Sequence, residues 1–176
     1  MSRVRAYRRI GAIDGIEVHK PPVGREVIED VPDIGELITR GSLESYEGRL
    51  QADLEAIGLE EQHVFVARGE DGRVQGILVG FFLGWAAYGR PELEDIYGGL
   101  LIDTLSTHAY IDAIEVYEKR QGVGRRLFQA FEKWAKEHGA EGIAGSPMSL
   151  EARAFHSSMG LSPHPDDYKL WVKWIE

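Results

Sequence analysis

The chain has 176 residues, of which 43% are hydrophobic and 28% charged, and its formal net charge is −9. This composition favours a folded domain over a disordered chain, and the lack of cysteine excludes disulfides, thiolate zinc sites and a cysteine nucleophile. An acidic surface repels phosphate backbones and attracts protonated amines, so we expect no nucleic-acid partner.

The length fits one domain over residues 1–176, although residues 1–25 show no clear pattern. No apolar run follows the N-terminal arginines, so we expect no secretory signal. The most apolar stretch, Gly76 to Ala87, is shorter than the roughly 20 residues that span a bilayer. We therefore expect a cytoplasmic protein without a membrane partner, and a homodimer is compatible with the sequence.

The first half of the chain predicts one strand, two helices and a β-hairpin. The strand covers Gly15 to His19, and apolar residues at helical spacing predict helices within 30–38 and 43–57. The segments 63–68 and 74–85 are apolar and β-branched, and the Asp-Gly pair between them is typical of a tight hairpin.

The second half alternates strands with helices. Residues 86–107 are predicted to be a long loop with a short helix near 92–97, followed by a strand over 109–116. An apolar stripe from Val123 to Ala135 predicts the clearest helix, which Gly139 would end.

Three shorter elements complete the chain. They are a strand over 143–145, a helix from the N-cap Ser149 to Met159, and a strand over 168–175. This order of elements predicts an α/β fold with a mixed sheet.

Two glycines, Gly122 and Gly124, lie between the predicted strand and the clearest helix. A helix N-terminus presents unpaired N–H groups to an anion, and glycine lets the backbone approach a phosphate. Positive charge gathers around these glycines at Lys119, Arg120, Arg125 and Arg126. A diphosphate is the expected ligand, although this spacing alone is equally compatible with a simple tight turn.

The stretch Lys119-Arg-Gln-Gly-Val-Gly124 resembles the [QR]-x-x-G-x-[GA] motif of the GCN5-related N-acetyltransferase family. A second stretch, Ser149 to Leu161, keeps the spacing of the family pattern N-x-x-A-x-x-[FL]-Y-x-x-x-G-F. Four residues depart from the usual ones: Lys119 replaces Arg or Gln, Ser149 replaces Asn, His156 replaces Tyr and Leu161 replaces Phe. The two motifs stand in the family's order on the expected elements.

The resemblance implies a mostly antiparallel central sheet flanked by helices, and acetyl-CoA bound where the strands at Ile114 and Ile143 separate. Backbone groups of Ile114 and Val116 would bind the pantetheine arm, and an N–H near Val116 would polarise the acyl carbonyl. The other expected cofactor-binding residues are Lys119, Arg120, Gln121, Gly122, Val123, Gly124, Arg125 and Ser149. No metal is expected.

The implied reaction is direct acetyl transfer to the amine of a small molecule or a protein. A non-catalytic acyl-CoA-binding module with the same fold is the alternative. The expected general base is His108, with Asp103, Asp112 and Glu115 as rivals. His156 occupies the position of the tyrosine that often protonates the leaving thiolate. Around the long loop, the aromatic residues Trp85, Tyr88 and Tyr97 could contact the acceptor or fill the core.

Overall fold

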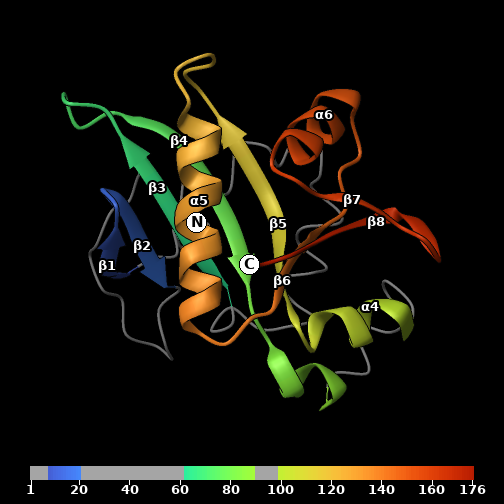
Figure 1. Cartoon of the computed structure of the whole chain (residues 1–176). Coiled ribbons are helices and arrows are strands. Elements are labelled where there is room, and N and C mark those ends of the chain that lie inside the picture. The colour runs from blue at the N-terminus through green and yellow to red at the C-terminus, as the bar shows by residue number, and fades with distance from the viewer. Residues whose placement is uncertain (1–7, 21–61, 90–98) are drawn as a thin grey trace, which may run out of the picture.

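The computed structural model describes residues 8–20, 62–89 and 99–176 (Figure 1). Its elements, in chain order, are β1 (Arg8–Ile13), β2 (Ile16–Lys20), β3 (His63–Arg68), β4 (Val74–Phe81), the 3-10 helix η3 (Gly84–Gly89), α4 (Gly99–Leu105), β5 (His108–Val116), α5 (Val123–Glu137), β6 (Gly142–Gly145), α6 (Leu150–Ser158), β7 (Ser162–His164) and β8 (Asp167–Trp174). The helices expected within 30–38 and 43–57 and near 92–97 lie outside the described residues.

The eight strands form one sheet in the order β1-β2-β3-β4-β5-β6-β8-β7. Every neighbouring pair is antiparallel except β5 and β6, which run parallel. The connection between these two strands is α5, which crosses one face of the sheet (Figure 1). The expected mixed, mostly antiparallel sheet flanked by helices is therefore confirmed.

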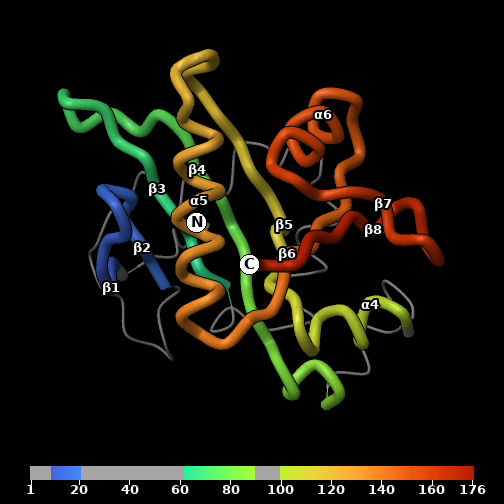
Figure 2. The backbone as a smooth tube through the Cα atoms, in the orientation of Figure 1, coloured from blue at the N-terminus to red at the C-terminus, as the bar shows by residue number. Residues whose placement is uncertain are grey.

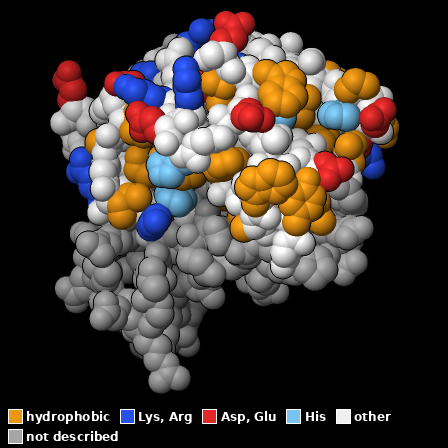
Figure 3. Space-filling model, turned by 60° about the horizontal axis from the view of Figure 1, so that its bottom comes forward, with side chains coloured by type: hydrophobic (Ala, Val, Ile, Leu, Met, Phe, Trp, Pro, Cys, Tyr) orange, Lys and Arg blue, Asp and Glu red, His pale blue; other side chains and the backbone are white. Residues whose placement is uncertain are grey.

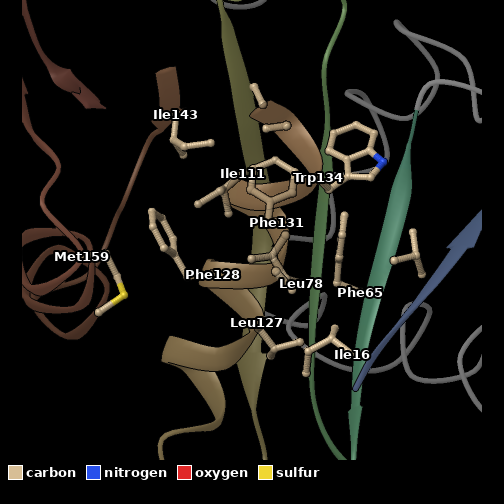
Figure 4. Close-up of a cluster of buried hydrophobic side chains, with 14 of the residues drawn as sticks. Ile16, Phe65, Leu78, Ile111, Leu127, Phe128, Phe131, Trp134, Ile143 and Met159 are labelled. Atoms are coloured by element: carbon tan, nitrogen blue, oxygen red, sulfur yellow. The ribbon is translucent and has the colours of Figure 1, made fainter. Parts of the chain in front are cut away.

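Helix α5 covers the sheet with the apolar stripe that the sequence predicts. Leu127 and Phe131 are fully buried, and Phe131 stacks on Trp134 with ring centroids 5.7 Å apart. Phe65 of β3 meets Phe131 edge-on at 5.3 Å (Figure 4). Burying a side chain of this size contributes about 1.5–3 kcal/mol, so this contact layer is a main source of the fold's stability.

A glycine in β4 allows the helix to approach the sheet. A Cβ built on Gly80 would lie 2.6 Å from Cε2 of Phe131 and 2.8 Å from the backbone oxygen of Tyr110. No real Cβ tolerates such distances, so the ring of Phe131 occupies space that any other residue at 80 would fill.

The region between β4 and β5 differs from its prediction. The strand expected to reach Trp85 ends at Phe81, and η3 follows, with Gly84 at φ 58. The segment expected to be loop up to 107 contains α4. Helix α4 forms because Leu101, Ile102 and Leu105 are buried in a second apolar cluster on the sheet.

Two edge strands, β1 and β7, were not expected from the sequence. β1 begins with two arginines and β7 has only three residues, so neither shows the alternation of apolar and polar residues that predicts a strand. Within the described ranges, no helix has the length and apolar character needed to cross a membrane.

The contact between Gly80 and Phe131 yields a stability test. We expect Gly80→Ala to lower the free energy of unfolding by about 1–3 kcal/mol, because the added methyl overpacks the helix–sheet interface. In a Phe131→Leu background the same change should cost less, since the ring that it meets is gone. Urea denaturation of the four proteins measures this coupling. If Gly80→Ala lowers the free energy of unfolding equally with Phe131 and with Leu at position 131, the Phe131 ring is not what requires glycine at position 80.

Candidate functional site

The site begins where β5 and β6 part. Their parallel pairing runs only from His108–Gly142 to Ile111–Gly145, whereas β5 continues to Val116 and stays paired with β4. Beyond Ile111, therefore, no strand of the described residues pairs with this edge of β5. Figure 2 shows β5 extending past β6 toward the loop that leads into α5.

The backbone of Ile114 and Val116 faces this open edge. The backbone N–H of Tyr117 donates to the backbone oxygen of Gln75 at 2.8 Å, so the backbone polar groups of Tyr117 point toward β4. Backbone groups of successive strand residues point in opposite directions, so those of Val116 and Ile114 point away from β4. These are the two residues at which the sequence resemblance places the pantetheine arm.

The N-terminus of α5 follows directly. Gly122 precedes the helix with φ 72, and within the described residues it has no side-chain capping hydrogen bond. The first i to i−4 bond joins the N–H of Arg126 to the oxygen of Gly122, so the N–H groups of 123–125 have no helical partner. The exposed basic side chains around them are Lys119, Arg120, Arg125 and Arg126. This end of α5 can hold an anion.

The two glycines of the motif serve different purposes. No described atom lies within 4 Å of a Cβ built on Gly122, and its left-handed φ is the reason for glycine there. A Cβ on Gly124 would lie 3.0 Å from Cε2 of Phe155 and 3.4 Å from Cγ2 of Val116. Gly124 thus lets α5 pack closely against α6 and β5, a constraint that we did not foresee from the motif.

Helix α6 lies beside the open edge of β5 (Figure 1). Its N-cap is Ser149, whose hydroxyl accepts the N–H of Ala152 at 3.0 Å, as the sequence predicts for a cap. An ion pair between Lys119 and Glu151, 3.0 Å long, connects the basic loop to the first turn of α6. Both side chains are exposed, so the pair contributes about 0–1 kcal/mol, but it brings the two expected binding segments together.

His156 of α6 lies at the point of strand separation. It is 5% exposed, and its Nδ1 lies 2.8 Å from the backbone oxygen of Ala152. Its Nε2 lies against Gly145, where a Cβ would be 2.8 Å away. Burial lowers the pKa of His156, and the hydrogen bond to Ala152 opposes this only in part. The side chain is therefore neutral at neutral pH.

His108 lies elsewhere on β5. It is 4% exposed, its Nδ1 contacts Oγ1 of Thr107 at 2.8 Å, and its ring packs against Trp174. It precedes Ile111 by three residues, about 10 Å along a strand, and is roughly 20 Å from Ile114. Burial lowers its pKa, and its Nε2 has no hydrogen-bond partner among the described residues. The structure does not bring His108 to the open edge.

The three acidic rivals are also dispersed. Asp103 lies on α4 and accepts a hydrogen bond from the hydroxyl of Tyr88 at 3.2 Å. Asp112 lies at an irregularity in the β4–β5 pairing, next to Ile111. Glu115 lies between the core-facing residues Ile114 and Val116, so its side chain projects from the opposite face of the sheet. On that face, the burial of Tyr117 and the charge of Glu115 raise the pKa of Tyr117 to about 12.

The two described aromatic residues for which the sequence left open acceptor contact or a place in the core lie at the other end of the sheet. Trp85 is 84% exposed and Tyr88 52% exposed, and their rings are 5.8 Å apart on η3. Figure 3, which brings this end forward, shows exposed hydrophobic side chains on it. Tyr97 lies outside the described residues. Among the residues that the structure describes, no acidic and histidine cluster could hold a metal ion.

Comparison with known proteins identifies the fold. The sequence profile of the acetyltransferase (GNAT) family matches residues 31–161. A GNAT-family acetyltransferase from Staphylococcus aureus Mu50 has a TM-score of 0.57 at 13% identity, over 92% of this chain and 99% of that one. Tetrahymena GCN5 has a TM-score of 0.47 at 14% identity, over 76% and 86% of the two chains. A search of curated protein sequences found no match.

Buried histidines predict how stability depends on pH. A pKa below the ordinary 6.5 means that the unfolded chain binds the proton more readily than the folded protein. Stability should therefore fall as the pH decreases below about 6.5. His108→Gln should weaken this dependence, whereas His138→Gln, at an exposed histidine, should not. Urea denaturation across this pH range measures how the free energy of unfolding of each variant depends on pH. An unchanged dependence in His108→Gln would contradict the lowered pKa of His108.

Proposed function

The chain belongs to the acetyltransferase (GNAT) family, and we propose that it transfers an acetyl group directly from acetyl-CoA to an amine. Family membership supports acyl transfer in general. The observation that carries the more specific proposal is the open edge of β5 beyond Ile111, which leads to the uncapped, basic N-terminus of α5. One continuous surface can thus bind an amide-bearing arm and a diphosphate.

The pantetheine arm fits the open edge because it carries amide groups. Ile114 and Val116 offer backbone N–H and C=O groups in the alternating pattern that an added strand would use. Each such hydrogen bond contributes about 0.5–1.5 kcal/mol. The diphosphate would lie against the N–H groups of 123–125, where the helix dipole and the nearby arginines favour negative charge.

This placement sets the direction of the bound donor. The diphosphate end lies near α5, beyond Val116, so the thioester end lies toward Ile111 and Gly145. The donor supplies an activated acyl group. The sequence resemblance places the carbonyl-polarising N–H near Val116. With the thioester end toward Ile111, the open N–H of Ile114 would instead lie nearer the reacting carbonyl and would stabilise developing negative charge. Direct transfer needs no enzyme nucleophile, in agreement with a chain without cysteine.

Proton transfer is assigned to His156 rather than to His108. His108 is enclosed by Thr107 and Trp174, about 10 Å before the strands separate. His156 lies against Gly145 at the separation itself. Ser149 keeps its proposed place beside the donor, because it caps α6, whose first turn lies next to the basic loop, where Glu151 pairs with Lys119.

The alternative function is acyl-CoA binding without catalysis. It is favoured by the residues that depart from the family pattern at Lys119, Ser149 and His156. The two functions share the binding surface and differ only in turnover.

Thiol release decides between them. We expect acetyl-CoA to release free thiol in an amine-dependent manner when a panel of primary amines is tested. Because the chain has a net charge of −9, added salt should raise the KM for cationic amines. Alcohols of matched size should give no release. CoA binding without amine-dependent release would establish the non-catalytic module instead.

A charge reversal tests the diphosphate site. We expect Arg125→Glu to weaken CoA binding by about 10-fold or more, since it places a negative charge beside the diphosphate. Lys133→Glu makes the same charge change on the same helix, about 12 Å further along, and should have little effect. Calorimetry with CoA and with pantetheine, which lacks the diphosphate, measures both variants. If Arg125→Glu weakens pantetheine binding as much as CoA binding, or if the two variants lose the same affinity for CoA, the diphosphate does not bind beside Arg125.

A further inference from the structure

The hydrogen bond of His156 fixes which ring nitrogen carries the proton. A backbone oxygen can only accept a hydrogen bond, so Nδ1, 2.8 Å from the oxygen of Ala152, must be protonated. In the neutral ring Nε2 then bears a lone pair and no proton. This nitrogen is the one that lies against Gly145, at the end of β6.

This arrangement has a chemical consequence at the thioester. A tyrosine in this position carries a proton that it can donate to a leaving sulfur. Neutral His156 has no proton on Nε2, so it must receive one before it can donate one. In the proposed reaction, the group that loses a proton is the attacking nitrogen, and the group that gains one is the sulfur.

We propose that His156 is a proton relay, in which Nε2 takes the proton that the attacking nitrogen loses and delivers it to the departing sulfur. This rests on the proposed function. The acceptor enters as a neutral amine after giving its first proton to water. As the C–N bond forms and the C–S bond breaks, nitrogen loses one proton and sulfur takes the electron pair of the broken bond. The relayed proton completes the thiol, and His156 ends neutral, as it began.

The surroundings of His156 suit both transfers. The ring of Phe155 lies 6.0 Å from that of His156 between centroids, and the His156 side chain is 5% exposed. Burial disfavours the imidazolium, so the ring does not retain the proton that it accepts. A relay of this kind needs a group that gives up its proton as readily as it takes it.

Charged groups on the neighbouring elements do not alter this conclusion. On β5, Asp112 and Glu115 are not among the causes of the lowered pKa of His156. On β8, Lys173 binds Glu132 and the backbone oxygen of Met159. At the start of α6, Glu151 pairs with Lys119. Among the described residues, the pKa of His156 is set by burial and by the bond to Ala152.

The first test needs no turnover. Long-range proton–nitrogen NMR on histidine-labelled protein reports the tautomer of each neutral ring. We expect His156 to show a protonated Nδ1 and a bare Nε2 at neutral pH, with and without CoA. His138 is a built-in reference, since its Nδ1 lies 2.7 Å from the oxygen of Trp134 in the same i to i−4 geometry. A protonated Nε2 on neutral His156 would overturn the proposal.

The second test is kinetic. His156→Gln can hydrogen-bond but cannot relay a proton, so kcat should fall by about 10²-fold or more while the affinity for CoA stays unchanged. In the wild type, protonation of His156 adds its own step to the acid limb of kcat; the variant should lose this step and keep only the pH dependence of the amine itself. His138→Gln removes an exposed histidine with the same local bond and should retain both kcat and the limb.

The outcomes separate this inference from the function on which it rests. A wild-type protein that releases no thiol with any amine refutes the proposed function, and the relay with it. A wild type that turns over, with His156→Gln equal to it in rate, refutes the relay alone. A slower variant with an unchanged acid limb also refutes it, because the histidine would then serve packing or orientation and not proton transfer.

Discussion

The end of the β5–β6 pairing at Ile111 and Gly145 is the constraint on which the candidate site depends. Before this point the two parallel strands share a ladder, and beyond it one edge of β5 carries backbone groups that no described strand satisfies. An exposed edge of this kind is a ready template for an extended ligand. The same strand leads into α5, so its open edge and the positive end of the helix dipole form one surface.

On β6, glycine occupies the two positions against which histidine rings pack. On β6, a Cβ at Gly142 would lie 2.3 Å from Cδ2 of His108, and one at Gly145 would lie 2.8 Å from Nε2 of His156. Both rings are buried, yet their positions give them different capacities. His108 is enclosed within the paired part of the sheet and supports its packing. His156 meets the last residue of β6, where the β5–β6 pairing ends.

The sequence was most informative where one local pattern decides the structure. The stripe of α5, the caps at Ser149 and Gly139, and the basic glycine loop follow from helix geometry and charge, and all were placed correctly. Helix α4 was missed because its apolar residues pack on a cluster to which β4, η3, β5, β6 and β8 contribute, and no local pattern shows such a cluster. The sequence does not show where β5 and β6 separate, so it does not show that His108 lies within their paired part. The tautomer of His156 depends on a carbonyl one turn away, a detail that only coordinates provide.

Backbone amide NMR during a CoA titration shows whether CoA binds along the open edge of β5. The amides of Ile114 and Val116 and those of 123–125 should shift and become protected from hydrogen exchange, because they gain hydrogen-bond partners. The amide of Ala109, within the paired part of β5, should not change. Binding that leaves Ile114 and Val116 unaffected, or a titration without any shift, would contradict the account.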